Sequence, residues 1–236
     1  MTNKLRMPCQ DAVESVLDNC ERYGNCMASI DPVTPHDVFR RYLFAYTTVN
    51  LSWQSSVKLY TELVALDWPA RESEIRDVFI ASRVGFHDTG PRYIADFAAK
   101  YFKGVNYLRF MHRPSQSWTE LRRRLEKDIL GLGLIKISFT MELCYPQDSE
   151  IVCLDRHMLN RIFHKDPAKA CSTAQYEYYE QQWVQCCRYY GQAPAIVRLA
   201  YWDRMQGHRS PDYWAHVFKI KQQKEDVCIK TISSSI

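Results

Sequence analysis

The feature that most constrains the fold is a helical spacing of apolar residues that recurs along most of the chain. From Asp37 to Tyr60 the apolar positions fall on one helical face, at Val38, Tyr42, Leu43, Tyr46 and Val49. The same spacing marks residues 72–82, 91–102, 173–190 and 194–205, whereas few segments alternate as strands do. Start and stop signals agree, with a capping box at Ser117–Glu120 and a terminating Gly191. We therefore expect an all-α protein.

Size and composition fit one large domain or two small lobes that share a cleft. The chain has 236 residues, of which 46% are hydrophobic and 25% charged, and its net charge is +4. This balance is that of an ordinary globular protein, and a modest positive charge permits a polyanionic partner. We expect a single unit over 1–236, in which 164–220 complete the second lobe and 221–236 form a tail.

The sequence also indicates where the protein acts. It contains no apolar run of the length that a membrane helix needs, and residues 1–15 lack the apolar core of a signal peptide. We expect a monomer in the cytoplasm, without membrane association. Nine cysteines occur without a C-x-x-C pair, which favours reduced thiols and predicts neither a metal site nor a cofactor.

Residues 118–163 carry the most information. They predict a helix, a tight turn at Gly131–Gly133, a second helix, and an apolar segment that ends where Asp155 opens another helix. Glycines in such a turn let the backbone amides of the next helix approach a phosphate closely. Taken alone, the turn is more typical of an ordinary helix–helix connection.

The order of these features resembles the helix-hairpin-helix DNA glycosylase superfamily. Its members carry L-P-G-V-G-x-K-(T/V)-A and later V-D-(T/V)-H-(V/I/M)-x-R-(I/V), which are similar to LGLGLIK at 130–136 and IVCLDRHMLNRI at 151–162. Residues 83–101 and 44–57 resemble two earlier helices of the family, so the likeness covers about 44–163. The proline before the first hairpin glycine is missing, and Arg156 replaces a small residue after the aspartate.

The resemblance implies a two-lobed helical fold with the active site in the cleft between lobes, acting on double-stranded DNA. Asp155 would be the catalytic carboxylate, a role compatible with capping the following helix. Lys136 lies one residue beyond the position of the lysine nucleophile in bifunctional members. Its separation from Asp155 in the sequence nonetheless equals the separation between lysine and aspartate in some of those members. We therefore expect a monofunctional enzyme in which Lys136 assists catalysis or contacts DNA. The resemblance assigns DNA contacts to Gly131, Gly133, Leu134, Lys136, Arg156, His157 and Arg161.

Extrusion of a base from the duplex requires a wedge and a pocket. Asn50, Trp53 and Gln54 are candidates from the early helix, and His87 is a candidate from the loop at 84–90. Packing in the core or at the surface explains these residues equally well. The aromatic residues of the C-terminal third, Trp202 and Trp214 among them, are expected to pack helices together.

The run GLGLIKISFTMEL followed by CLDRHMLNRI resembles phage-linked alpha-glutamyl/putrescinyl thymidine pyrophosphorylases more than it resembles the housekeeping repair enzymes of the superfamily. Three functions stay open. The first is excision of a modified, bulky phage-type base, such as glucosylated hydroxymethylcytosine, as an antiviral defence. The second is transfer of an amine or amino acid to an activated hydroxymethylpyrimidine. The third is DNA binding without catalysis. Because the glycosylase aspartate is present, excision is the preferred function.

Overall fold

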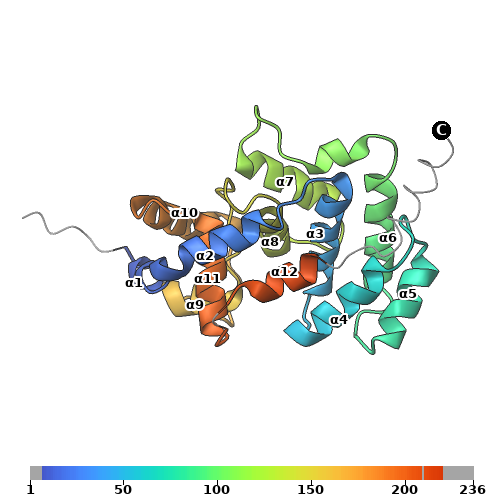
Figure 1. Cartoon of the computed structure of the whole chain (residues 1–236), viewed down its shortest axis with the longest axis horizontal. Coiled ribbons are helices and arrows are strands. Elements are labelled where there is room, and N and C mark those ends of the chain that lie inside the picture. Colours follow the sequence, from blue (N-terminus) through green and yellow to red (C-terminus); the bar gives the residue numbers. More distant parts are fainter. Residues whose placement is uncertain (1–6, 209, 220–236) are drawn as a thin grey trace, which may run out of the picture.

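The protein is built of helices, as the computed structural model shows for the residues that it describes, 7–208 and 210–219 (Figure 1). No strand occurs in these two ranges, which confirms the predicted all-α class. The α-helices are α1 (Gln10–Glu14), α2 (Leu17–Ala28), α3 (Pro35–Thr47), α4 (Trp53–Val64), α5 (Glu72–Ala81), α6 (Gly90–Tyr101), α7 (Trp118–Asp128), α8 (Leu134–Cys144), α9 (Arg156–Phe163), α10 (Thr173–Tyr189), α11 (Pro194–Met205) and α12 (Asp212–Phe218), with a 3₁₀ helix η1 (Asn106–Phe110) between α6 and α7.

Capping residues set many of these boundaries. The Ser117 hydroxyl accepts the amide of Glu120 at 3.2 Å while the Glu120 carboxylate accepts the Ser117 amide, which confirms the predicted capping box. Similar boxes begin α3 at Thr34 and α10 at Ser172. The predicted helices over 72–82, 91–102, 173–190 and 194–205 are confirmed to within one residue at each end.

One predicted element is wrong in extent, because the continuous periodicity from Asp37 to Tyr60 covers two helices. The chain leaves α3 after Thr47, and Asn50 adopts a left-handed backbone with φ 55°. Ser52 then caps α4 by accepting the amide of Ser55. A left-handed residue cannot continue a right-handed helix, so the apolar pattern survives while the helix does not.

The helices form two groups (Figure 1). One group contains α3, α4, α5, α6 and η1, which pack against one another. The other contains α9, α10 and α11 together with the N-terminal helices α1 and α2, and α2 also packs against α12. Helix α12 also reaches the first group, because the rings of Trp214 and Phe218 pack against Phe44 of α3.

Helix α8 joins the two groups. It packs along α3 of the first group and against α7, and every residue from Ile137 to Cys144 is buried. Its Glu142 carboxylate pairs with Arg198 of α11 in the second group, and both side chains are at most 3% exposed. Residues at the start of α8 consequently lie where the two groups meet.

Two further expectations concern parts of the chain that bear less on the site. No helix within the described residues is long and apolar enough to span a membrane. The predicted tail, 221–236, lies outside the described residues.

Candidate active site

The segment that leads to Asp155, residues 151–154, is buried and lies in neither a helix nor a strand. Its amide groups would lose hydrogen bonds on burial unless side chains replaced the missing strand partners. Three buried side chains do so, from α8 and α10. The acceptors are Glu180 for the Val152 amide (3.0 Å), Glu142 for the Cys153 amide (2.9 Å) and the Tyr176 hydroxyl for the Leu154 amide (2.9 Å). The backbone before Asp155 is therefore fixed residue by residue.

Asp155 is the N-cap of α9, as its sequence context predicted. Its Oδ1 accepts the backbone amide of Met158 at 2.8 Å, and its Oδ2 accepts the indole Nε1–H of Trp202 at 3.1 Å. The side chain is half-buried. Both donors are neutral, so they hold the carboxylate in one orientation without cancelling its negative charge.

Lys136 lies in the first turn of α8, and its amine is turned into the junction between the two helix groups. Nζ donates to the backbone oxygen of Thr48 at 2.8 Å and to its hydroxyl at 2.9 Å, just beyond the end of α3. Burial lowers the pKa of Lys136, and the nearby Asp155 and Cys153 partly oppose this shift. An amine in this state is more readily available as a base or nucleophile than an exposed lysine.

A buried ion pair ties these residues together. The Arg198 guanidinium donates to both carboxylate oxygens of Glu142. Burial raises the pKa of Glu142, and the Arg198 charge counteracts that shift. Glu142 shares α8 with Lys136, and Arg198 precedes Trp202 by one turn of α11. The pair thus fixes α8 and α11 relative to each other. It thereby also fixes the Lys136 amine on α8 relative to the Trp202 indole on α11.

The hairpin between α7 and α8 needs glycine for two different reasons. Gly131 has φ 83°, and a Cβ there would lie 2.4 Å from Tyr93 of α6. The Tyr46 hydroxyl also donates to the Leu130 carbonyl at 2.7 Å, so α3 and α6 both hold the turn. Gly133 is the N-cap of α8, and nothing lies within 4 Å of the Cβ it lacks. An open position before the first amides of a helix is a suitable place for a phosphate.

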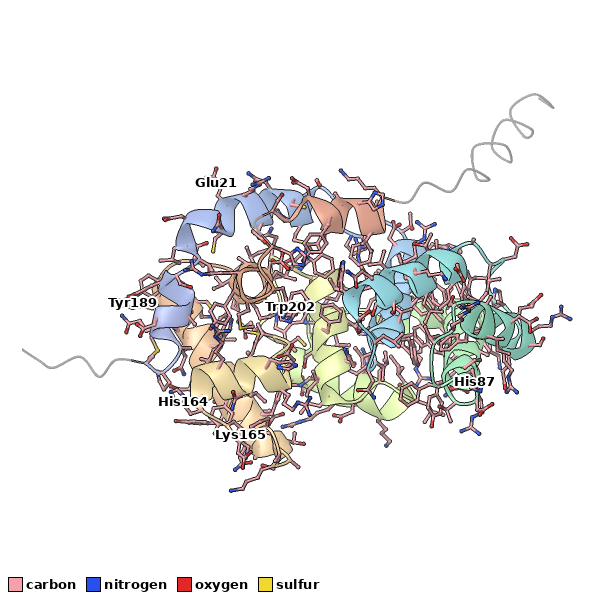
Figure 2. All side chains as sticks on the ribbon, turned by 90° about the horizontal axis from the view of Figure 1, so that it is seen from below. Glu21, His87, His164, Lys165, Tyr189 and Trp202 are labelled. Carbon is pink, nitrogen blue, oxygen red and sulfur yellow. The ribbon has the colours of Figure 1, made fainter. Side chains whose placement is uncertain are left out.

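The other predicted DNA contacts lie on accessible positions. Arg156, His157 and Arg161 are exposed on α9, immediately after Asp155, and Leu134 is half-buried at the start of α8. At the far end of α9, His164 and Lys165 lie at the surface of the molecule in Figure 2. The predicted contact residues therefore belong to the hairpin and to α9, on both sides of Asp155 in the sequence.

The four predicted wedge and pocket residues separate into two places. Trp53 packs against Trp202 of α11, with ring centroids 6.4 Å apart, and against Trp214 of α12. Asn50 and Gln54 are exposed on either side of the start of α4. His87 is exposed in the loop between α5 and α6 and lies well apart from Trp202 in Figure 2. Three candidates thus flank the junction, and His87 does not join them.

Sequence reasoning missed Trp202, Thr48, Glu142 and Arg198. Glu142 lies within the run GLGLIKISFTMEL and Thr48 within residues 44–57, but neither had a role assigned to it. The other two stand in no motif, and Trp202 was expected only to pack helices. One signal could have found Glu142 and Arg198. Each is a charged residue among apolar residues of a predicted helix, and charged side chains are rarely buried unless they are paired. In the part of the chain that the structure describes, no group of His, Cys, Asp or Glu could hold a metal ion.

This protein has the fold of the helix-hairpin-helix DNA glycosylases. Its described residues are all-α, and a glycine hairpin precedes a helix that an aspartate caps. The 8-oxoguanine glycosylase/lyase of Methanocaldococcus jannaschii, in complex with a 15mer DNA containing 8-oxoguanine, matches with a TM-score of 0.69 and 16% identity, over 85% of this chain and 98% of that one. A second structure of the M. jannaschii 8-oxoguanine DNA glycosylase matches with a TM-score of 0.62 and 15% identity, over 84% and 87%.

The 8-oxoguanine DNA glycosylase of Thermotoga maritima matches with a TM-score of 0.57 and 19% identity, over 84% of this chain and 92% of that one. No protein-family model matches the sequence, and no curated protein matches it. At these identities the similarity establishes the fold.

Proposed function

We propose that the protein is a DNA N-glycosylase that extrudes a modified base from the duplex and cleaves its glycosidic bond. The observation that carries the proposal is the Asp155 carboxylate, which is fixed at the start of α9 by two neutral donors. Lys136 has a half-buried amine whose pKa burial lowers and the Asp155 charge raises. The fold of known glycosylases supports it as well.

Asp155 supplies the electrostatic part of the reaction. Cleavage of an N-glycosidic bond builds positive charge on the sugar, which a fixed carboxylate stabilises. Because Met158 and Trp202 already orient the carboxylate, little reorganisation is needed as that charge develops. The hairpin at Gly131–Gly133 would hold the DNA backbone without reading its sequence.

Lys136 is proposed to take part in the chemistry through its amine. Attack by Nζ on C1′ would displace the base and leave an imine to the opened sugar, from which the 3′ phosphate is eliminated. The half-buried amine and its lowered pKa support this role, and the M. jannaschii neighbour is described as a glycosylase/lyase. We therefore extend the proposal to a bifunctional enzyme, which both releases the base and cuts the strand. The position of Lys136, one residue beyond that of the family's lysine nucleophile, had suggested a monofunctional enzyme.

The substrate we propose is a bulky modified base of the phage type, for example glucosylated hydroxymethylcytosine, removed as an antiviral defence. The resemblance of residues 131–162 to phage-linked proteins supports this choice. The rings of Trp53 and Trp202 near Asp155 provide aromatic surface for an extruded base. The solved neighbours are 8-oxoguanine glycosylases, so 8-oxoguanine belongs among the substrates tested.

The test uses three DNAs, which carry glucosylated hydroxymethylcytosine, 8-oxoguanine or no modification. Each is incubated with wild type and with Asp155→Asn, and abasic sites and released bases are measured, the latter by mass spectrometry. Release of one modified base by wild type alone supports the proposal. Intact bases throughout would refute excision of these substrates. A separate reaction, with a fourth DNA that carries activated hydroxymethyluracil and with an added amine, tests the transferase alternative. A base of altered mass in an intact strand would favour it.

Lyase chemistry is tested in the same reactions by borohydride, which reduces an imine to a stable bond. Wild type should become covalently attached to DNA, whereas Lys136→Gln should not. Release of a base without covalent attachment of the protein to DNA would show that the enzyme is monofunctional.

A further inference from the structure

The hydrogen bond between Trp202 and Asp155 joins two helices that are remote in the sequence. Trp202 lies on α11, Asp155 caps α9, and 47 residues separate them. In Figure 2 Trp202 is labelled near the centre of the view, and its side chain is half-buried. Helix N-caps need only one acceptor oxygen, which Oδ1 provides to Met158. The bond to Oδ2 is therefore not needed for capping.

The surroundings of Trp202 restrict where its indole N–H can point. One turn earlier on α11, Arg198 is held by Glu142, whose Oε1 also accepts the Cys153 amide. The next residue, Asp203, is fully buried and accepts the hydroxyl of Tyr23 from α2 at 2.6 Å. Contacts on either side thus fix the axial position and rotation of α11.

The chemistry of the donor suits a carboxylate that must remain negative. An arginine or lysine in this place would orient Oδ2 but would also offset the charge that stabilises the sugar cation. An indole has one N–H, no net charge and no acceptor, so it fixes a direction and leaves the charge available. Its half-buried ring also shields the carboxylate on the side of α11.

We propose that Trp202 is a positioning residue that holds Oδ2 of Asp155 in its reactive orientation, an inference that rests on the proposed glycosylase function. Removal of the indole N–H leaves Asp155 capping α9 through Oδ1, but nothing then holds Oδ2 and the carboxylate plane can tilt about the remaining hydrogen bond. The base-excision step then slows, while DNA binding through the hairpin and α9 is unchanged.

The first measurement observes the bond itself and does not require activity. In ¹H–¹⁵N spectra the indole resonance of Trp202 is identified by its absence from Trp202→Phe. Asp155→Ser keeps a capping oxygen but is too short to reach the indole, so the Trp202 indole proton should move upfield. The Trp183 indole, which donates to the Pro194 carbonyl at 3.1 Å, serves as an internal control and should not move. An unmoved Trp202 resonance overturns the proposal.

The second measurement separates positioning from packing. On the DNA that wild type cleaves, single-turnover excision by Trp202→Phe should fall by roughly 10- to 100-fold, the size expected for a hydrogen bond to a charged group. The dissociation constant for the same DNA should change by no more than about twofold. Replacement of the Trp202 indole by benzothiophene, which keeps the ring shape and removes the N–H, should give the same loss.

Trp183→Phe is the matched control, because it removes an indole hydrogen bond of equal length from a fully buried ring. It should excise at the wild-type rate even though it is less stable. A benzothiophene protein that excises at the wild-type rate, or a loss seen in DNA binding alone, would overturn the positioning role. A wild type that excises no base refutes the proposed function instead, and the indole spectrum then decides by itself whether Trp202 holds Asp155.

Discussion

Asp155→Asn separates the two roles that the structure gives this residue, as helix cap and as carboxylate. Aspartate accepts the Met158 amide with one oxygen and the Trp202 indole with the other. Asparagine caps helices as well as aspartate does, but it has a single acceptor oxygen. The cap should persist, while the Trp202 N–H faces an amide NH₂ group and loses its partner.

The magnitudes differ for stability and for activity. One lost hydrogen bond to a charged group costs about 1.5 kcal/mol at a half-buried site, which lowers Tm by roughly 3–6 °C in a domain of this size. Loss of the charge removes electrostatic stabilisation of the transition state, for which about 3–4 kcal/mol is typical, or a rate lower by roughly 10²–10³-fold. The variant should therefore fold and bind DNA but excise almost nothing.

The assay combines thermal unfolding followed by circular dichroism with single-turnover excision at 25 °C. Asp155→Ala is the companion variant, since it also removes the cap and should lose a further 1 kcal/mol or so of stability with a similar loss of rate. A rate for Asp155→Asn within about tenfold of wild type would refute the assignment of Asp155 as the catalytic carboxylate. A fall in Tm large enough to unfold the protein at 25 °C would show that the structural role was underestimated.

Three other predictions follow from the site and its frame. Because burial lowers the pKa of Lys136, the borohydride-trapping rate should rise with pH and level off at a pH below the usual lysine pKa. Between the lowered pKa of the folded state and the usual pKa of the unfolded state, the folded protein binds fewer protons. Over this pH range the free energy of unfolding of wild type should therefore rise with pH relative to that of Lys136→Met. Gly131→Ala should cost about 1–3 kcal/mol in urea unfolding, because its φ is 83° and the new Cβ would lie 2.4 Å from Tyr93; an unchanged midpoint would contradict this hairpin geometry. Glu142→Gln should lower the free energy of unfolding by about 3–5 kcal/mol, because it leaves the buried Arg198 charge without its partner. A decrease of less than about 1 kcal/mol would contradict this and would mean that water reaches the pair.

Local structure was largely predictable, because it depends on residues within one or two turns of each other. The capping box at Ser117, the glycine turn at 131–133 and the helix that opens at Asp155 were all predicted from neighbouring residues. The error over 37–60 shows the limit of this reasoning. Periodicity reports which face is buried, and it continued across the left-handed Asn50, where the helix did not.

The sequence by itself determined the helical class, the hairpin and the position of Asp155 at the start of a helix, because hydrogen bonds between residues three or four apart and the spacing of apolar residues decide these features. Only the tertiary structure decided which groups surround the carboxylate. Trp202 reaches Asp155 across 47 residues, and Lys136 reaches Thr48 across 88. Such contacts depend on how α3, α8 and α11 pack, and the packing angle of two helices has no signature in the residues next to the contact.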